Sequence, residues 1–435
     1  MSATQSPLAV NLQTDAEKQF FEDEHNSKVD SSCFLSKRAW WEVLLVGGIC
    51  GGLLAGVPLG VLLSARTSSS SNRCDDSTAN IISKNWGSIE VYSESFHGVV
   101  DPSSTLQLLA TMDGYPEGPL WDSKTETLLV SNALLPSNSI FSWSNRTVPS
   151  SSTAGSGLVP FMHPAGYIGY QNFSNVGVNA LPGYEGVPFY GPNGQIFNKD
   201  LQHVLCQQGN GRIVRVNDVT GFEPICSTYL GTRFYAPNDV IQDQYGWYWF
   251  TDLNAAFPDM WGLNVTGVFA TKGGQVVLVE STLTNPNGLA FFPGDETRLL
   301  LSETGDLFDF EAIGHPANYY SYDVTRDAVT GEPTLSNKNL FFDGAAHSIQ
   351  KQVQGHADGL KIHSSGIVFA SGPGGILVLD STGTLIAQLG LKGIATNCWI
   401  AEDSSPPYLF ITASDMADYG GGANIGGILR LELKF

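Results

Sequence analysis

A short pattern that recurs six times limits the fold of this chain more than any other feature of its sequence. In each copy an Asn, Asp or Glu stands directly before a short apolar run, and a turn and further β-rich runs follow. The six residues are Glu117, Asn193, Asn238, Asn287, Asp358 and Asn397. Internal repetition of this kind is typical of solenoids, propellers and similar arrays. The repeats therefore predict a body made of similar units.

The runs within each repeat are short and rich in Val, Ile, Tyr, Phe and Trp, and Gly, Asp and Asn turns separate them, as expected of β-strands. Four strands in each of six repeats predict an all-β six-bladed propeller with four-stranded blades over residues 100–435. The last repeat lacks a fourth strand, and residues 106–110 are expected to supply it and close the ring. Wide spacings between repeats predict insertions at about 145–190 and 303–318. No amphipathic helical pattern alternates with the strands, which argues against a parallel β/α fold.

The composition excludes two broad classes of protein. Lys+Arg total 22 and Asp+Glu total 42 among 435 residues, which gives a formal charge of −20. So acidic a chain is unsuited to binding nucleic acid, and no nucleic-acid partner is expected. Hydrophobic residues make up 42% of the chain, so it can bury a large core and is not disordered throughout.

Residues 43–65 form an apolar stretch without a charged side chain. A helix of this length spans a hydrocarbon core of about 30 Å, and Trp40 and Trp41 stand where aromatic rings favour the headgroup region. The sequence therefore predicts a transmembrane signal-anchor helix at 43–65. A disordered cytoplasmic tail at 1–42 would precede it, and a Ser-rich stalk at 66–99 would follow. A buried core helix and a cleaved signal peptide are the alternatives.

Charges beside this stretch predict its orientation. Lys28, Lys37 and Arg38 precede it, which favours a single-pass protein with a cytoplasmic N-terminus and a lumenal or extracellular propeller in the secretory pathway. Three sequons agree with this orientation and predict N-glycosylation at Asn145, Asn172 and Asn264. Glycines recur every four residues in the span, at 48, 52, 56 and 60, which permits a helix-mediated dimer.

The six repeated Asn, Asp and Glu residues point to a common site. In a propeller the innermost strand of each blade lines a central channel, so equivalent positions face the same axis. Two carboxylates and four carboxamides would then converge at one end of the channel. Such a ring of oxygens suits a hard cation and lacks the thiolate and imidazole ligands of copper or structural zinc sites. The alternative is that these residues only cap turns, although Glu117 is a poor turn former.

Several segments of the body carry motifs of one known family. They are Glu117-Gly-Pro-Leu-Trp121, Pro237-Asn-Asp-Val240, Tyr248-Trp-Phe-Thr-Asp252, Pro286-Asn-Gly-Leu289, Asp358-Gly-Leu360, Ser371-Gly-Pro-Gly-Gly-Ile376, Thr396-Asn-Cys398 and Leu409-Phe-Ile-Thr-Ala413. Their order and number resemble the senescence-marker-protein/gluconolactonase/luciferin-regenerating-enzyme family of calcium-dependent lactone hydrolases. Residues 204–213 are similar to the second blade of its gluconolactonase branch. The resemblance covers roughly residues 100–435 and leaves out the span at 43–65.

The resemblance implies a role for each residue of the ring. A glutamate, an asparagine and an aspartate bind one metal ion in that family, and here they would be Glu117, Asn287 and Asp358. Asn238 matches an asparagine that touches the substrate. The expected substrate-binding set consists of Asn238, Asn193 and Asn397. Calcium is the expected ion, with zinc and manganese as alternatives.

Three residues depart from the family's pattern. Gln208 stands where relatives often have histidine, His356 precedes a position often held by proline, and His363 replaces a frequent aspartate. These changes bear on substrate preference more than on metal binding. His356 also lies two residues from Asp358, which makes it the histidine of most interest for acid–base chemistry.

The implied activity is hydrolysis of a lactone, a cyclic ester. A dication would polarise the carbonyl, and Asp358 is the expected general base. The sequence contains no G-x-S-x-G, H-E-x-x-H, P-loop or Rossmann motif. A strictosidine-synthase-like or paraoxonase-like propeller enzyme and a non-catalytic propeller scaffold are the alternatives. The glycine- and aromatic-rich segment 162–190 precedes the second inner strand and is predicted to be a substrate lid.

Overall fold

The computed structural model describes residues 86–435 apart from several internal segments. Those segments are 102, 135–136, 145–156, 168–190, 220, 254–262, 264, 295, 306–311 and 415–424. The predicted tail, membrane span and most of the stalk lie outside the described residues, as do Asn145, Asn172 and Asn264 and most of the predicted lid. No helix among the described residues is long and apolar enough to span a bilayer.

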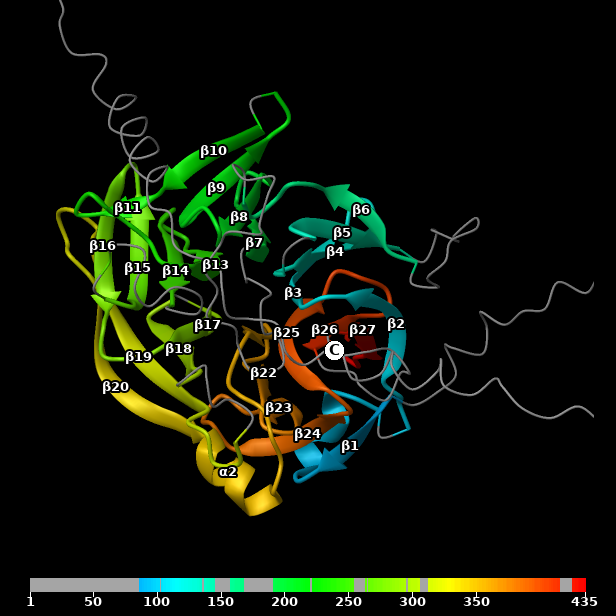
Figure 1. Ribbon diagram of the computed structural model, residues 1–435. Helices are drawn as coiled ribbons and strands as arrows, with labels where there is room; N and C mark the ends of the chain where they lie inside the picture. The colour runs from blue at the N-terminus through cyan, green and yellow to red at the C-terminus, as the bar shows by residue number, and fades with distance from the viewer. Residues whose placement is uncertain are drawn as a thin grey trace, which may run out of the picture. The chain divides into compact units, whose positions relative to one another are not determined.

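Six antiparallel sheets are arranged in a ring, which confirms the predicted all-β six-bladed propeller (Figure 1). The first three blades follow the chain order from the inner strand outward. They are β3 (Pro116–Asp122), β4 (Thr127–Asn132), β5 (Ser139–Trp143) and β6 (Val159–Met162); β7 (Pro192–Phe197), β8 (His203–Gln207), β9 (Arg212–Asn217) and β10 (Gly221–Cys226); and β13 (Pro237–Gln242), β14 (Tyr248–Asp252), β15 (Gly267–Lys272) and β16 (Gln275–Glu280).

The other three blades use the same order of strands. They are β17 (Pro286–Phe291), β18 (Arg298–Glu303), β19 (Asn318–Arg326) and β20 (Pro333–Asp343); β21 (Leu360–Ile362), β22 (Val368–Gly372), β23 (Gly375–Leu379) and β24 (Leu385–Leu391); and β25 (Ile394–Ala401), β26 (Tyr408–Ser414) and β27 (Ile425–Glu432). The inner strands β3, β7, β13, β17, β21 and β25 contact one another in turn, and β25 contacts β3, so the ring is closed.

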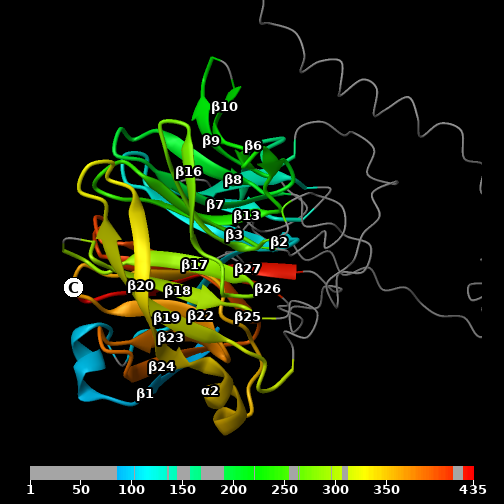
Figure 2. The ribbon, with the colours of Figure 1, turned by 90° about the vertical axis from the view of Figure 1, so that its left-hand side faces the viewer.

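Two strands from the start of the propeller complete the last two blades. Strand β2 (Gln107–Asp113) pairs with β27, with Leu108 opposite Leu429, and this confirms the predicted closure. Strand β1 (Gly87–Val91) adds a fifth strand to the fifth blade by pairing with β24 (Figure 2). The propeller therefore begins before residue 100, within the segment that the sequence assigned to the stalk.

Smaller elements connect the blades. The 3₁₀ helix η2 (Glu94–Gly98) links β1 to β2, and β11 (Thr228–Tyr229) and β12 (Thr232–Arg233) form a hairpin between the second and third blades. The α-helix α2 (Gly344–Lys351) follows β20, and the Asp343 carboxylate caps it by accepting a hydrogen bond from the Ala346 N–H at 2.8 Å. This helix accounts for part of the wide spacing between the fourth and fifth repeats.

The core lies between neighbouring blades. Between the fifth and sixth blades, side chains of β22 and β23 pack against those of β26 and β27, and Phe96 of η2 is fully buried among them. Between the sixth and first blades, the rings of Trp121 and Phe410 stack with centroids 5.2 Å apart. Burial of each such large apolar side chain contributes roughly 1.5–3 kcal/mol, so the contacts between blades stabilise the ring.

Candidate active site

All six residues of the predicted ring are buried within or just before the inner strands. The ring is defined by Glu117, Asn193, Asn238, Asn287, Asp358 and Asn397, whose exposed fractions lie between 1% and 6%. The strand register shifts at this position in five of the six blades. A bulge of this kind bends a strand and redirects a side chain. The repeated sequence pattern thus corresponds to a repeated irregularity of the backbone.

Hydroxyl groups hold the ring by its backbone. Ser131 donates to the carbonyl oxygen of Asn193 at 2.7 Å, and Thr251 and Ser302 donate to those of Asn287 and Asp358 at 2.7 and 2.6 Å. Each hydroxyl belongs to the second strand of one blade, and each carbonyl belongs to the next blade. The bonds therefore fix the spacing between blades while leaving the ring side chains available for other contacts.

Glycine follows four of the ring residues because neighbouring inner strands approach closely there. Gly118 has a φ of +47°, and a Cβ atom on it would collide with the carbonyl oxygen of Asn193. A Cβ atom on Gly359 would collide with the side-chain amide of Asn397. The Glu-Gly, Asn-Gly and Asp-Gly pairs of the repeat therefore reflect crowding at the channel as well as chemistry.

Asp358 lies at the centre of the most connected part of the ring. Its Oδ2 atom accepts hydrogen bonds from His356 Nε2 at 3.1 Å and from the Tyr115 hydroxyl at 3.5 Å. Asn287 and Glu117 lie close enough to influence the pKa of this carboxyl group. The structure thus brings together the three residues predicted to bind a metal ion, together with two neighbours.

Three ring residues have buried side-chain oxygens without a hydrogen-bond donor. Among the described residues, Asp358 Oδ1, Asn287 Oδ1 and Asn193 Oδ1 are buried and have no hydrogen-bond partner. The Asn287 amide donates to the Thr304 hydroxyl at 3.0 Å, which leaves its oxygen as the open end. Buried polar atoms are normally paired, so unpaired oxygens at one place indicate a ligand. The donor set fits a hard divalent cation, which prefers carboxylate and amide oxygens.

Burial raises the pKa of both carboxyl groups of the ring. Burial, together with the nearby charge of Asp239, raises the pKa of Asp358 to about 8. Burial and the neighbouring Asp358 also raise the pKa of Glu117. Two carboxylates this close repel each other unless a positive charge lies between them. No group of three or more His, Cys, Asp or Glu suited to a metal occurs in the described part of the chain, and the candidate set here consists of two carboxyl groups and one amide.

The other ring residues differ in their contacts. Asn397 donates to Glu117 Oε2 at 3.1 Å, and its own oxygen accepts from the Cys398 N–H at 2.8 Å. Asn193 keeps its oxygen unpaired, and Asn238 is buried at the start of β13. Asn397 therefore supports Glu117 through its amide group.

Three neighbours of the ring have no counterpart in the sequence predictions. Tyr115 contacts Asp358, and Asp239 and Lys361 lie beside the ring with their charged groups 3.4 Å apart. Only Asp239 carries a detectable signal, because it stands where four other repeats have glycine. His356, singled out for its position, does contact Asp358, whereas His363 stacks on Phe435 away from the ring.

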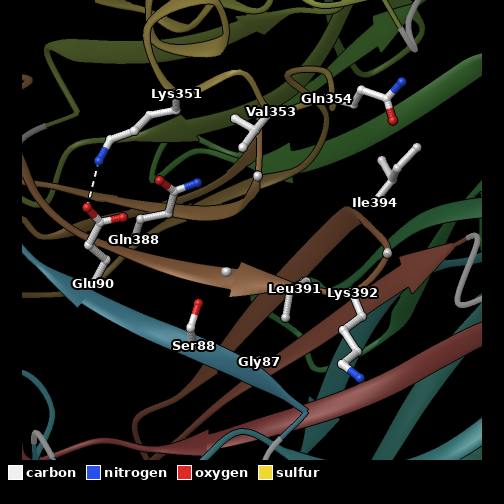
Figure 3. Close-up of a pocket in the computed structure, with 13 residues that line it drawn as sticks. Gly87, Ser88, Glu90, Lys351, Val353, Gln354, Gln388, Leu391, Lys392 and Ile394 are labelled. Carbon is white, nitrogen blue, oxygen red and sulfur yellow. Dashed lines mark hydrogen bonds and ion pairs between the residues drawn. The ribbon is translucent and has the colours of Figure 1, made fainter. Parts of the chain in front are cut away.

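A hollow of about 810 Å³ lies outside this site, at the edge of the fifth blade (Figure 3). It is lined by residues of β1, β24 and the segment after α2, and by none of the ring residues. Two of its polar side chains bond each other, Lys351 and Glu90, at 2.6 Å. Gln388 likewise donates to the Pro373 carbonyl at 2.9 Å. The ring, with its open oxygens, is therefore the stronger candidate for an active site.

The fold and the site define a six-bladed β-propeller with buried carboxyl and amide groups on its inner strands. Sequence comparison identifies the family within this class of fold. The model of the SMP-30/Gluconolactonase/LRE-like region matches residues 115–415, and the chain belongs to this family. The matched range includes the whole ring.

Two curated proteins and one solved structure show how far the similarity extends along the chain. A gluconolactonase of Zymomonas mobilis is 28% identical over 373 residues, which cover 82% of this chain and 92% of the relative. A lactonohydrolase of Aspergillus oryzae is 24% identical over 46% of this chain and 50% of its own. The solved structure of a gluconolactonase from Xanthomonas campestris has a TM-score of 0.58 and 21% identity. It covers 80% of this chain and 95% of that protein, and supports the fold.

Proposed function

We propose that this chain hydrolyses a lactone with the help of a divalent cation, most suitably calcium, held by Glu117, Asn287 and Asp358. The observation that carries the proposal is the pair of unpaired, buried oxygens on Asn287 and Asp358, next to a second buried carboxyl group. Membership of the gluconolactonase-like family and the Zymomonas relative support lactones as the substrate class.

The residues of the site have different roles in the proposed ester hydrolysis. A bound dication would polarise the carbonyl and stabilise the oxyanion that forms. Asp358 would accept the proton of the attacking water and return it to the ring oxygen of the lactone as the ester C–O bond breaks. Oδ1 is its open atom because His356 and Tyr115 already engage Oδ2. Glu117 contributes charge, and Gly118 and Asn397 hold its Oε2 atom. Asn238 and Asn193 offer amide groups that can orient the ring oxygens of a substrate.

A panel of lactones tests this function on the full-length protein, with and without a chelator. We expect hydrolysis of at least one lactone, loss of turnover with the chelator and recovery when calcium is restored. Zinc and manganese, added in parallel, compare the alternative ions. If a chelator leaves turnover unchanged, the proposed dependence on a metal ion is wrong. If no lactone is turned over, the proposed hydrolysis is wrong, and the non-catalytic scaffold is favoured.

We also propose that the propeller lies in the lumen of the secretory pathway or outside the cell, anchored by residues 43–65. The apolar stretch, the preceding basic residues and the three sequons support this topology. Carbonate extraction tests the anchor, and a glycosidase-dependent mobility shift tests modification at Asn145, Asn172 and Asn264. The proposed topology is contradicted if carbonate releases the protein from the membrane and glycosidase treatment does not change its mobility.

A further inference from the structure

A lysine side chain lies among residues of three different inner strands. Lys361 belongs to β21, and its ammonium group lies 3.4 Å from Asp239 Oδ2 of β13 and 3.5 Å from Asn397 Oδ1 of β25. It also donates to the Leu360 carbonyl oxygen at 2.9 Å. Residues of the third, fifth and sixth blades meet only in the channel, so this ammonium group occupies the channel beside the ring.

Three oxygens surround this nitrogen in the way that they would surround a bound cation. The Lys361 side chain is 17% exposed and that of Asp239 is 4% exposed, so water contributes little around the pair. A carboxylate, an amide oxygen and a backbone carbonyl are also the ligand types that hard metal ions prefer. The lysine therefore occupies a position whose surroundings suit a positive ion.

The negative charges in the channel favour a positive group at this position. Glu117, Asp239 and Asp358 are all buried, and the charge of Asp239 raises the pKa of both other carboxyl groups. Their three negative charges and the one positive charge of Lys361 leave a net charge of −2 when all are ionised. One dication brings this sum to zero. A second dication would leave a net charge of +2, against +1 if the lysine charge were absent.

Lys361 also reaches the ring through Asn397. Because the amide oxygen faces the ammonium group and the Cys398 N–H, the amide nitrogen faces Glu117 Oε2, 3.1 Å away. Gly359 allows this arrangement, since a side chain there would collide with the Asn397 amide. Lys361 is thus a positioning residue for Glu117.

We propose that the Lys361 ammonium group is a tethered cation that fills a second cation position in the channel, so that the ring binds a single dication. The inference rests on the proposed metal site for the occupant of the ring. It predicts that removing the lysine charge opens a second metal site made of Asp239 Oδ2, Asn397 Oδ1 and the Leu360 carbonyl oxygen.

Metal stoichiometry of the full-length protein tests the proposal without reference to activity. Calcium binding is measured by titration calorimetry and by elemental analysis of wild type and Lys361→Met, with melting temperature as the check on folding. We expect one ion for the wild type and two for Lys361→Met. Lys351→Met is the matched control, because it removes a lysine of α2 at the outer hollow, away from the ring, and it should bind one ion.

A second variant moves binding in the opposite direction and covers the case in which Lys361→Met does not fold. Asp239→Asn leaves the lysine in place and reduces the net charge to −1, so the affinity of the ring for calcium should fall about tenfold. Unchanged affinity in Asp239→Asn, or a single ion in a folded Lys361→Met, overturns the proposal.

The outcomes separate this inference from the proposed function. If the wild type binds one ion and Lys361→Met also binds one, the tethered cation is wrong and the metal-dependent hydrolase stands. If the wild type binds none and Lys361→Met binds one, the lysine does occupy a cation position, but the metal-dependent mechanism fails.

Discussion

Two sets of buried Asn, Asp and Glu residues occur in this propeller, and they differ in what their oxygens contact. One set is the ring. The other set anchors the loops that lead into the inner strands and consists of Asn132, Asp252 and Glu303. Asp252 accepts hydrogen bonds from the Tyr235 and Ala236 N–H groups at 2.9 and 2.7 Å. Burial and residue type are alike in both sets, and the difference is that the ring has buried oxygens on Asn193, Asn287 and Asp358 without a hydrogen-bond partner.

The comparison shows how a repeat can serve stability and function with the same residue types. The oxygens of the anchor residues accept hydrogen bonds from backbone N–H groups that would otherwise be buried and unpaired, and this stabilises the fold. Ring oxygens on Asn193, Asn287 and Asp358 lack such donors, which costs stability until a ligand binds. Anchor variants should therefore lose stability, whereas ring variants should lose binding and turnover.

The largest expected effect is on an anchor. Glu303 accepts hydrogen bonds from the N–H groups of Thr284, Asn285 and Gly305, each at 2.9 Å. Glu303→Ala leaves three donors without their partner, and we expect a loss of about 3 kcal/mol or more in the free energy of unfolding. Denaturant titration measures it, with exposed Glu432→Ala as a control. A loss below about 1 kcal/mol would show that the loop does not depend on this carboxylate.

The second-largest expected effect is a loss of turnover when a ring residue, Asp358, is changed. Asp358→Asn keeps an oxygen but loses the base, so lactone turnover should fall at least about 100-fold. The free energy of unfolding of the metal-free protein should stay equal or rise, because a buried carboxyl group is replaced by a neutral amide. Kinetics and denaturant titration on one preparation provide both values. Full turnover would remove Asp358 from the mechanism, and strong destabilisation would make it an anchor.

A smaller effect is expected at Asn238. Asn238→Ala should lower kcat/KM about tenfold or more with only a modest loss of metal, because the amide is proposed to contact the substrate. Metal content, melting temperature and kinetics should be measured together. A lower melting temperature with unchanged kinetics would place Asn238 among the residues that stabilise the turn.

The smallest effect concerns His356, which touches the ring without belonging to it. His356→Phe removes the donor to Asp358 Oδ2, and we expect calcium affinity to fall about tenfold, as is common when a partner of a ligand is lost. His356→Gln retains a donor and should restore part of the affinity. If both variants bind calcium as the wild type does, the Tyr115 hydroxyl alone is sufficient to hold Asp358.

The sequence predicts those parts of the molecule that repeat. The six blades, the closing strand at 106–110 and the convergence of Glu117, Asn287 and Asp358 all follow from one pattern, because equivalent residues of a propeller face one axis. Strand β1 is not part of a repeat and pairs with β24 at the outer edge of the fifth blade, so no repeated sequence pattern predicts it. Tyr115 and Lys361 likewise reach the ring through side-chain directions that strand order alone does not determine.

The double closure of the ring has a consequence for how the protein is made. The side chains of Gln107 in β2 and Arg430 in β27 are bonded across 323 positions of the chain. At about 5–20 residues per second, a ribosome needs roughly 16–65 s to supply the second partner after the first. During that time β1 and β2 have exposed edges and no blade to join. The nascent propeller therefore passes through an open ring, which is the state that a chaperone in its compartment would have to protect.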